Sequence, residues 1–168
     1  MKEIVAIWLA ISLALYLALV YSPNADDRDR MIYFHVPMAW ISYLAFTITF
    51  VGSTSYLKKR NVKLDDIAHS SAKLGLLFGA LALVTGAIWA KMRWGAFWNW
   101  DPRQTTTLIL WLVYAAYLTL RSAIVNEEKR ARITAVFAIL GFICIIISYV
   151  SVKFSALHPQ ELPTFGGT

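Results

Sequence analysis

Residues 133–152 read ITAVFAILGFICIIISYVSV, a stretch of twenty residues without a charged side chain. A bilayer has a hydrocarbon core of ~30 Å, and a helix that rises ~1.5 Å per residue needs about 20 apolar residues to cross it. This stretch is therefore typical of a membrane-spanning helix. It decides the fold class, because one spanning helix places the whole chain in a membrane.

The rest of the sequence contains four more stretches of this kind, at about residues 4–21, 32–57, 68–90 and 105–120. Hydrophobic residues make up 58% of the chain and charged residues 15%, whereas soluble domains have roughly 45–50% and about 25%. The first stretch has the length of a signal peptide, but no small-residue cleavage site follows it, so we expect a retained helix. The sequence predicts an all-α polytopic membrane protein with five spanning helices in a single membrane domain, residues 1–168.

Lysines and arginines in the connections predict the orientation, because cytoplasmic loops carry an excess of these residues. With the N-terminus inside, nine of them fall on the cytoplasmic side: Lys2, Lys58, Lys59, Arg60, Lys63, Arg121, Lys129, Arg130 and Arg132. Six fall on the opposite side: Arg28, Arg30, Lys91, Arg93, Arg103 and Lys153. We therefore expect the N-terminus inside and the C-terminus outside. Because these cations flank membrane spans, the net charge of +6 does not indicate a nucleic-acid-binding protein.

Two glycines and the single cysteine in the spans indicate how the helices pack and which cysteine chemistry is excluded. Gly75 and Gly79 lie four residues apart in the third span and predict a face where two helices pack closely. Cys144 is the only cysteine, which excludes an internal disulfide and a CxxCH motif. The chain therefore has no cysteine pair with which to attach haem covalently.

The connection at residues 91–104 lies on the predicted outer face and is rich in tryptophan. Trp94, Trp98 and Trp100 are three of the seven tryptophans in the chain. A single tryptophan at this level is most simply an anchor at the membrane surface, where an apolar ring with one polar N–H is favoured. Together with Phe97 they are too dense for anchoring alone, and they predict a flat apolar platform for a large planar ligand.

The end of this connection reads as the start of the fourth helix. Asp101 is a preferred N-cap residue, Pro102 suits the first helical position, and Gln104 is placed to complete a capping box. Arg103 lies in the first turn, where a cation opposes the helix dipole. Two interpretations of Arg103 stay open: it binds an external carboxylate, or Asp101 neutralises it.

Two of the three histidines share the predicted outer face with this connection. His35 lies at the start of the second helix and His158 lies in the tail after the fifth. Imidazole is a common axial ligand of haem iron, so a haem site is one hypothesis, and two ordinary hydrogen-bonded histidines are the other. His69, near the inner start of the third helix, is interpreted as an ordinary hydrogen-bonded residue.

Residues 94–105, WGAFWNWDPRQT, resemble the tryptophan-rich "WWD" signature of the haem-handling proteins of cytochrome c biogenesis. Within that group the chain is most similar to the haem exporter protein C (CcmC) family. Residues 33–40, 83–86 and 149–158 resemble that family's two histidine segments and the helix before the loop. The family typically has a sixth helix after the second histidine, whereas this chain stops at Thr168, so the expectation is a form without it, either naturally short or a fragment.

The resemblance implies a non-covalent, transient haem b on the outer, periplasmic side of the plasma (inner) membrane. It assigns His35 and His158 as the axial ligands of the iron. The remaining contacts that it implies are Trp94, Trp98, Trp100, Asp101 and Arg103. Arg103 is the first candidate for a propionate, with Lys91, Arg93, Arg28 and Arg30 as the others.

The resemblance also implies a function and partners. The expected function is that of a non-enzymatic carrier, which binds haem and delivers it to a CcmE-type haem chaperone. A CcmD-type small subunit, a CcmA/CcmB-type ABC complex and membrane lipid are the other expected partners. Three alternatives stay open: a cytochrome c synthase (haem lyase), an electron-transfer b-type cytochrome subunit, and a small membrane scaffold without a ligand.

Overall fold

The computed structural model describes residues 13, 16, 27–155 and 157. Within these residues the chain forms four α-helices and one 3-10 turn: α2 Asp27–Lys59, α3 Val62–Trp94, α4 Pro102–Ala123, α5 Glu127–Val150 and η1 Ser151–Phe154. All four α-helices are long and apolar enough to cross a membrane. The predicted all-α membrane class is therefore confirmed. The predicted first span, residues 4–21, lies outside the described residues apart from Leu13 and Tyr16.

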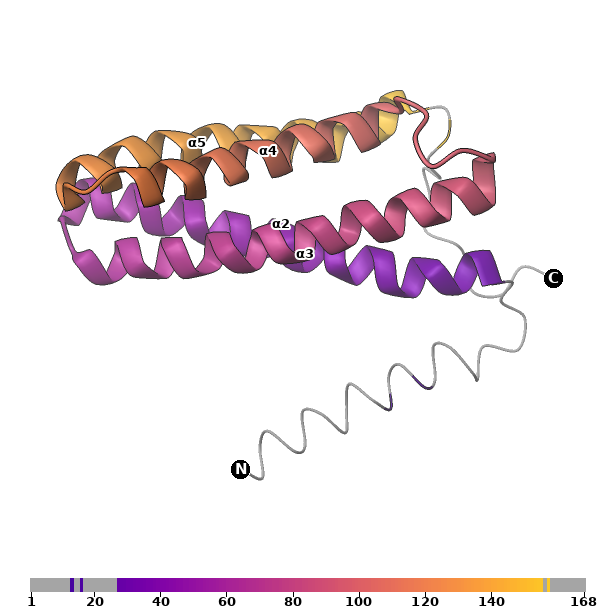
Figure 1. Ribbon diagram of the computed structural model, residues 1–168, viewed down its shortest axis with the longest axis horizontal. Helices are drawn as coiled ribbons and strands as arrows, with labels where there is room; N and C mark the ends of the chain where they lie inside the picture. Colours follow the sequence, from indigo (N-terminus) through magenta and orange to yellow (C-terminus); the bar gives the residue numbers. More distant parts are fainter. Residues whose placement is uncertain (1–12, 14–15, 17–26, 156, 158–168) are drawn as a thin grey trace.

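The four helices form an antiparallel bundle. Figure 1 shows α2 and α3 side by side in one layer and α4 and α5 side by side in the other. The start of α2, the α3–α4 connection and η1 lie together at one end, which we call the loop end. The α2–α3 and α4–α5 connections lie at the other, which we call the far end. The start of α2 and the α3–α4 connection, which the sequence placed on one face, therefore do meet at one end of the bundle.

The helices begin and end further out than the apolar stretches suggested. α3 covers Val62–Trp94 rather than residues 68–90, and α4 covers Pro102–Ala123 rather than residues 105–120. The reason is capping: Asn61 accepts a hydrogen bond from the Lys63 backbone N–H, so α3 starts among polar residues that hydropathy leaves out. α2 and α5 are likewise extended at their polar starts. The non-helical part of the predicted loop 91–104 shrinks to residues 95–101.

The centre of the bundle is an aromatic stack with glycines against it. The rings of Phe46 and Tyr114 stack at 3.7 Å between centroids, and both side chains are buried. Gly75 lies against Phe46, and a Cβ on Gly79 would lie 3.0 Å from Ser42 Oγ and from Trp111 Cδ1. The predicted close-packing face on α3 is confirmed, since larger residues at both positions would push the helices apart.

Hydrogen bonds between side chains and neighbouring helices fix the register of the bundle. The Tyr43 hydroxyl and the Ser148 hydroxyl are 2.9 Å apart, which joins α2 to α5. Trp111 Nε1 donates to the Leu76 carbonyl at 3.0 Å, which joins α4 to α3. In a lipid environment such bonds replace the water that polar groups would otherwise bind.

Candidate functional site

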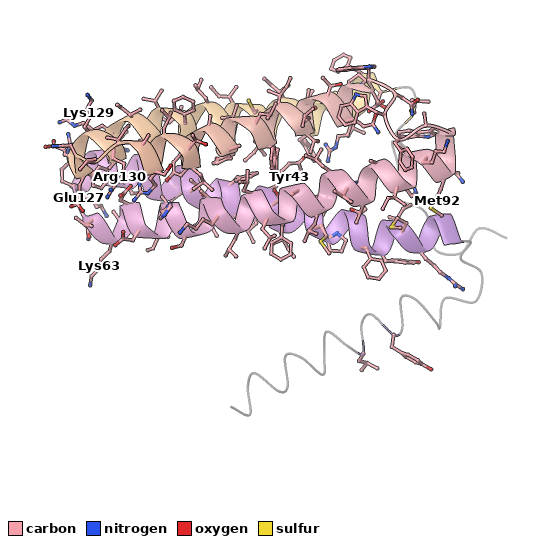
Figure 2. All side chains as sticks on the ribbon, in the orientation of Figure 1. Tyr43, Lys63, Met92, Glu127, Lys129 and Arg130 are labelled. Carbon is pink, nitrogen blue, oxygen red and sulfur yellow. The ribbon has the colours of Figure 1, made fainter. Side chains whose placement is uncertain are left out.

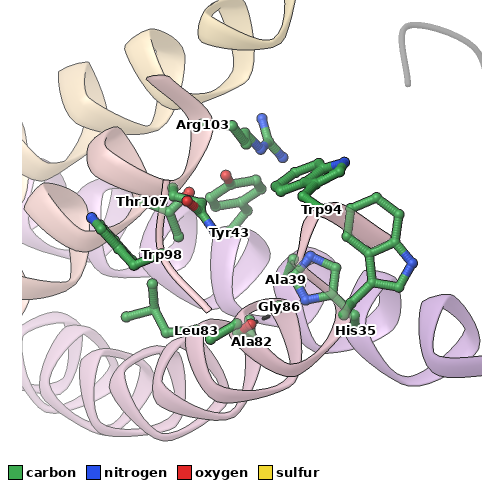
Figure 3. Close-up of a pocket in the computed structure, with 13 residues that line it drawn as sticks. His35, Ala39, Tyr43, Ala82, Leu83, Gly86, Trp94, Trp98, Arg103 and Thr107 are labelled. Carbon is green, nitrogen blue, oxygen red and sulfur yellow. Dashed lines mark hydrogen bonds between the residues drawn. The ribbon is translucent and has the colours of Figure 1, made fainter. Parts of the chain in front are cut away.

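A cleft opens at the loop end of the bundle, between α2, α3 and the start of α4 (Figure 3). It is lined by His35, Ala39, Tyr43, Ala82, Leu83, Gly86, Ala87, Trp89, Trp94, Trp98, Arg103, Gln104 and Thr107. Its empty volume is about 520 Å³ when the space at its open mouth is counted.

His35 is held in a defined orientation in the wall of this cleft. Its Nδ1 lies 3.0 Å from the Ala82 carbonyl oxygen and 3.3 Å from Thr85 Oγ1. A carbonyl oxygen only accepts, so Nδ1 carries the proton and the ring's lone pair lies on Nε2. Histidines that bind metals are commonly oriented in this way, with one ring nitrogen bonded to a carbonyl and the other directed to the metal.

Gly86 makes room for the imidazole. A Cβ at this position would lie 2.7 Å from His35 Cε1 and 3.1 Å from Nδ1. Only glycine therefore allows the ring to lie this close to α3. Gly86 belongs to the same face of α3 as Ala82, four residues earlier, so one helix face supplies both the space and the hydrogen bond.

The loop begins with a glycine that ends α3. Gly95 has a left-handed φ of 83° and its N–H donates to the Lys91 carbonyl, as expected of a helix C-cap. Lys91 in turn donates from Nζ to the Gly95 carbonyl at 2.7 Å. The Lys91 ammonium therefore binds the end of α3, which matches a structural role for that cation.

The tryptophans of the loop end separate into two groups. Trp94 and Trp98 line the cleft, and Trp94 packs edge-on against Trp89 at 5.0 Å between ring centroids. Trp100 packs edge-on against Trp98 at 5.9 Å, but its own side chain is 75% exposed. The predicted platform is therefore a wall of two tryptophans, Trp94 at the end of α3 and Trp98 in the loop, with Trp100 beyond it.

Asp101 is the N-cap of α4, as predicted. Its Oδ1 accepts from the Arg103 backbone N–H at 2.8 Å, and the residue is 4% exposed. Its Oδ2 accepts a hydrogen bond from the Ser155 hydroxyl. This buried carboxylate joins the loop to the segment after α5, and it is not among the residues that line the cleft.

The predicted capping box is wrong in its second half. Gln104 does not return to the backbone N–H of Asp101; its side-chain oxygen accepts from the Asn99 backbone N–H at 3.1 Å. Its amide nitrogen donates to the Phe97 carbonyl at 3.4 Å. The chain bends within residues 97–100, where Trp100 has a positive φ of 55°, and the Asn99 N–H and Phe97 carbonyl lie within hydrogen-bond distance of Gln104.

The side chain of Arg103 points into the cleft wall and binds α5. Its Nη1 donates to the Ser148 carbonyl at 2.6 Å, and its guanidinium lies 5.5 Å from the centre of the Tyr43 ring. The hydrogen bond of this side chain is therefore to α5 rather than to the Asp101 carboxylate. A guanidinium has five N–H donors, so the bond to Ser148 leaves donor capacity for a ligand.

Sequence reasoning missed Tyr43 and Trp89, which both line the cleft. A helical signal exists for each. Tyr43 follows His35 by eight residues, two turns along the same face of α2, and Trp89 follows Ala82 by seven on α3. This helical spacing identifies Tyr43 and Trp89 as cleft residues only once His35 is known to face α3.

The family model described as "Heme exporter protein C" (CcmC) matches residues 2–163. The chain belongs to the haem exporter protein C family.

Relatives within and beside this family differ in how much of their length is matched. A "Putative cytochrome c biosynthesis ccmC-like mitochondrial protein" of Marchantia polymorpha is 34% identical over 164 residues, covering 95% of this chain and 69% of that protein. "Heme exporter protein C" of Bradyrhizobium diazoefficiens is 33% identical over 171 residues, covering 96% and 65%. "Cytochrome c biogenesis protein CcsA" of Prochlorococcus marinus is 41% identical over 92 residues, covering 55% and 28%. The chain thus spans about two thirds or less of the length of these relatives.

In this haem exporter protein C family member, the structure brings four of the predicted site residues to one cleft: His35, Trp94, Trp98 and Arg103. It places Trp100 and Asp101 beside the cleft rather than in its lining. His158 lies outside the described residues. Of the other cations predicted for propionates, Lys91 caps α3, and the side chain of Arg28 also lies outside the described part of the chain.

Proposed function

We propose that this chain binds haem b reversibly at the loop end of the bundle and hands it on for cytochrome c maturation. Membership of the haem exporter protein C family supports the ligand class. The observation that carries the proposal is His35: its Nδ1 is bonded to the Ala82 carbonyl within an aromatic cleft that also contains Arg103. An imidazole, aromatic walls and a guanidinium suit an iron porphyrin with carboxylate side chains.

The roles follow from the chemistry of each side chain. His35 Nε2 would bind the iron, and Trp94 and Trp98 would hold the porphyrin ring by apolar contact. Arg103 would bind a propionate, because charge-assisted bonds to a carboxylate are stronger than neutral ones. The porphyrin ring is proposed to occupy the open mouth of the cleft. Trp100, being exposed, is proposed to contact haem from outside the cleft.

His158 is proposed as the second axial ligand. The hydrogen bond between Ser155 and Asp101 supports this, because it holds the segment after α5 at the loop. His158 is the third residue after Ser155 in the sequence, a reach of at most ~11 Å for an extended chain. Two imidazoles would fill both axial positions of the iron and suppress oxygen chemistry, which suits a carrier.

Release of haem to a partner completes the proposed function. Delivery to a CcmE-type haem chaperone, with a CcmD-type subunit and a CcmA/CcmB-type complex, is proposed from the family alone. The excess of lysine and arginine at the far end supports a cytoplasmic location for that end. The loop end would then face outward from the inner membrane, with the N-terminus inside.

A cytochrome c synthase is the second candidate. The 41% identity with a CcsA protein over 92 residues favours it, because that stretch is shared with a protein named for cytochrome c biogenesis rather than haem export. The two functions differ in product. A carrier releases intact haem, whereas a synthase leaves haem covalently bound to an apocytochrome.

The optical spectrum of the full chain, purified in detergent, tests haem binding. We expect a low-spin haem spectrum that is lost or strongly reduced in His35→Ala. His69→Ala is the matched control, because His69 lies on α3 towards the far end and should keep wild-type haem content. Trp98→Ala should lower haem content more than Trp100→Ala. Equal haem content in wild type and His35→Ala would exclude the proposed ligand.

Incubation with haem and an apocytochrome separates the two candidates. After acid–acetone extraction, a carrier leaves no haem on the apocytochrome. Haem that survives the extraction would identify a synthase.

A further inference from the structure

A second pocket lies at the far end of the bundle, between α3, α4 and α5. Its lining includes His69 and Lys73 from α3, Arg121 from α4 and Arg130 from α5. Its empty volume is about 760 Å³ with open space included. Figure 2 shows Arg130 together with Lys63 and Lys129 at the end of the molecule opposite Met92. The pocket therefore lies at the opposite end of the bundle from the loop-end cleft, and the two share no lining residue.

Arg121 forms the fixed wall of this pocket. Its guanidinium makes two hydrogen bonds to the carboxylate of Asp65, at 2.8 and 2.5 Å, and its side chain is 6% exposed. The two-point contact holds the guanidinium plane in one orientation. Because Asp65 already balances this charge, the pocket's surplus of positive charge has to come from other residues.

Lys73 and Arg130 supply that surplus. Lys73 is exposed and makes neither an ion pair nor a hydrogen bond with the residues that the structure describes. Arg130 forms a long ion pair with the exposed Glu127, with 3.6 Å between Nη2 and Oε1, and its buried Nε has no hydrogen-bond partner among the described residues. Both cations thus keep most of their donor capacity.

His69 is a third residue of this pocket with an unused hydrogen-bonding group. Its Nδ1 is buried without a hydrogen-bond partner in the described part of the chain, so the expected ordinary hydrogen-bonded histidine is not found. The charges around it are Arg121, Lys73 and Arg130 against Asp65. One carboxylate, Asp66, also lines the pocket and is exposed. With Arg121 balanced by Asp65, the two remaining cations of the lining, Lys73 and Arg130, face one exposed acid, Asp66, and this surplus favours an anion.

The surroundings indicate an anion that carries an apolar part. Leu77 follows Lys73 by one helical turn on α3 and is 56% exposed, and Leu74 is 53% exposed. Leu118 lines the pocket itself. Basic pockets between membrane helices on the cytoplasmic side are suited to phosphate headgroups, with acyl chains along the apolar faces below.

We propose that this far-end pocket binds the phosphate group of an anionic ligand, with Lys73 and Arg130 as its principal contacts. A phospholipid headgroup and a soluble phosphate offer the same chemistry. The exposed leucines below Lys73 favour the lipid. The proposal stands independently of haem binding, because none of these residues takes part in the loop-end cleft.

Native mass spectrometry of the full chain tests this with phosphatidylglycerol, phosphatidylcholine and inorganic phosphate as separate probes. We expect preferential retention of phosphatidylglycerol over phosphatidylcholine. Lys73→Gln and Arg130→Gln should each weaken that retention about fivefold, since a basic residue near an anionic headgroup contributes ~1 kcal/mol. Lys129→Gln is the matched control, because Lys129 is adjacent in sequence, exposed and outside the pocket.

The three probes give distinguishable outcomes. Retention of inorganic phosphate that is lost in the two pocket variants supports the phosphate site with a soluble source. Equal retention of phosphatidylglycerol in all variants, or an equal loss in Lys129→Gln, would overturn the proposal. Thermal unfolding of each variant without lipid shows whether the substitution has damaged the fold. Asp66→Asn, which removes the pocket's exposed acid, should strengthen retention in a folded protein.

Discussion

At the scale of single residues, the site depends on the position of the His35 ring against α3. The hydrogen bond to Ala82 joins residues 47 apart in sequence, and no local pattern predicts it. The sequence indicated that His35 was a ligand candidate because it lies in a segment that resembles the family. It did not indicate which nitrogen would face the ligand, since that depends on a carbonyl of another helix.

Gly86→Ala tests this arrangement. The added methyl group would lie 2.7 Å from His35 Cε1, so the ring has to move and the bond to Ala82 is disturbed. We expect haem content to fall several-fold, with a loss of stability of about 1–3 kcal/mol from overpacking. Haem content per folded protein is the quantity to measure.

Gly52→Ala is the control for this substitution. Its Cβ would lie 2.9 Å from the Leu64 carbonyl oxygen, which gives a similar clash between α2 and α3 away from the cleft. It should destabilise the bundle without changing the haem content of the folded fraction. A Gly86→Ala protein with unchanged haem content would mean that the ring position is unimportant for binding.

At the scale of helices and loops, the long apolar runs predicted the spans because a bilayer fixes the length of an apolar helix. Their ends were not predictable from hydropathy, since N-cap residues extend α3, α4 and α5 into polar sequence. Asp101 is the exception, because an Asp-Pro helix start is a local signal. Its bond to Ser155 was not foreseen, as it joins two segments 54 residues apart.

Substitution of Asp101 tests how the start of α4 contributes to stability. Asp101→Ala removes the N-cap of α4 and the bond to Ser155, so we expect a loss of about 2 kcal/mol in unfolding free energy. Asp101→Asn keeps a good capping oxygen and should lose much less. Unfolding in mixed detergent–denaturant measures both. If the two variants lost equal stability, the carboxylate charge rather than the cap would be the important feature.

At the scale of the whole molecule, the two ends of the bundle carry different chemistry. The loop end combines aromatic rings with His35 and Arg103, while the far end combines cations with a buried ion pair between Asp65 and Arg121. Sequence predicted the gathering of distinctive residues at the loop end, because alternating spans bring those connections together. The far-end ion pair was not predicted, since its partners are 56 residues apart.

Arg121→Leu tests the contribution of this pair to the whole bundle. Removing one partner leaves the buried Asp65 carboxylate without its counter-charge, and we expect a loss of about 3–5 kcal/mol in unfolding free energy. The double variant Asp65→Leu, Arg121→Leu should recover much of that loss, because no unpaired charge remains. A double variant that is less stable than Arg121→Leu would contradict this account.

The central claim is that His35 binds haem iron in the loop-end cleft. The most direct measurement is the low-spin haem spectrum of His35→Gly with and without added imidazole. Glycine leaves space for a free imidazole, so we predict that the spectrum is lost in the variant and restored by imidazole. A low-spin spectrum that persists in His35→Gly and does not respond to imidazole would contradict the claim.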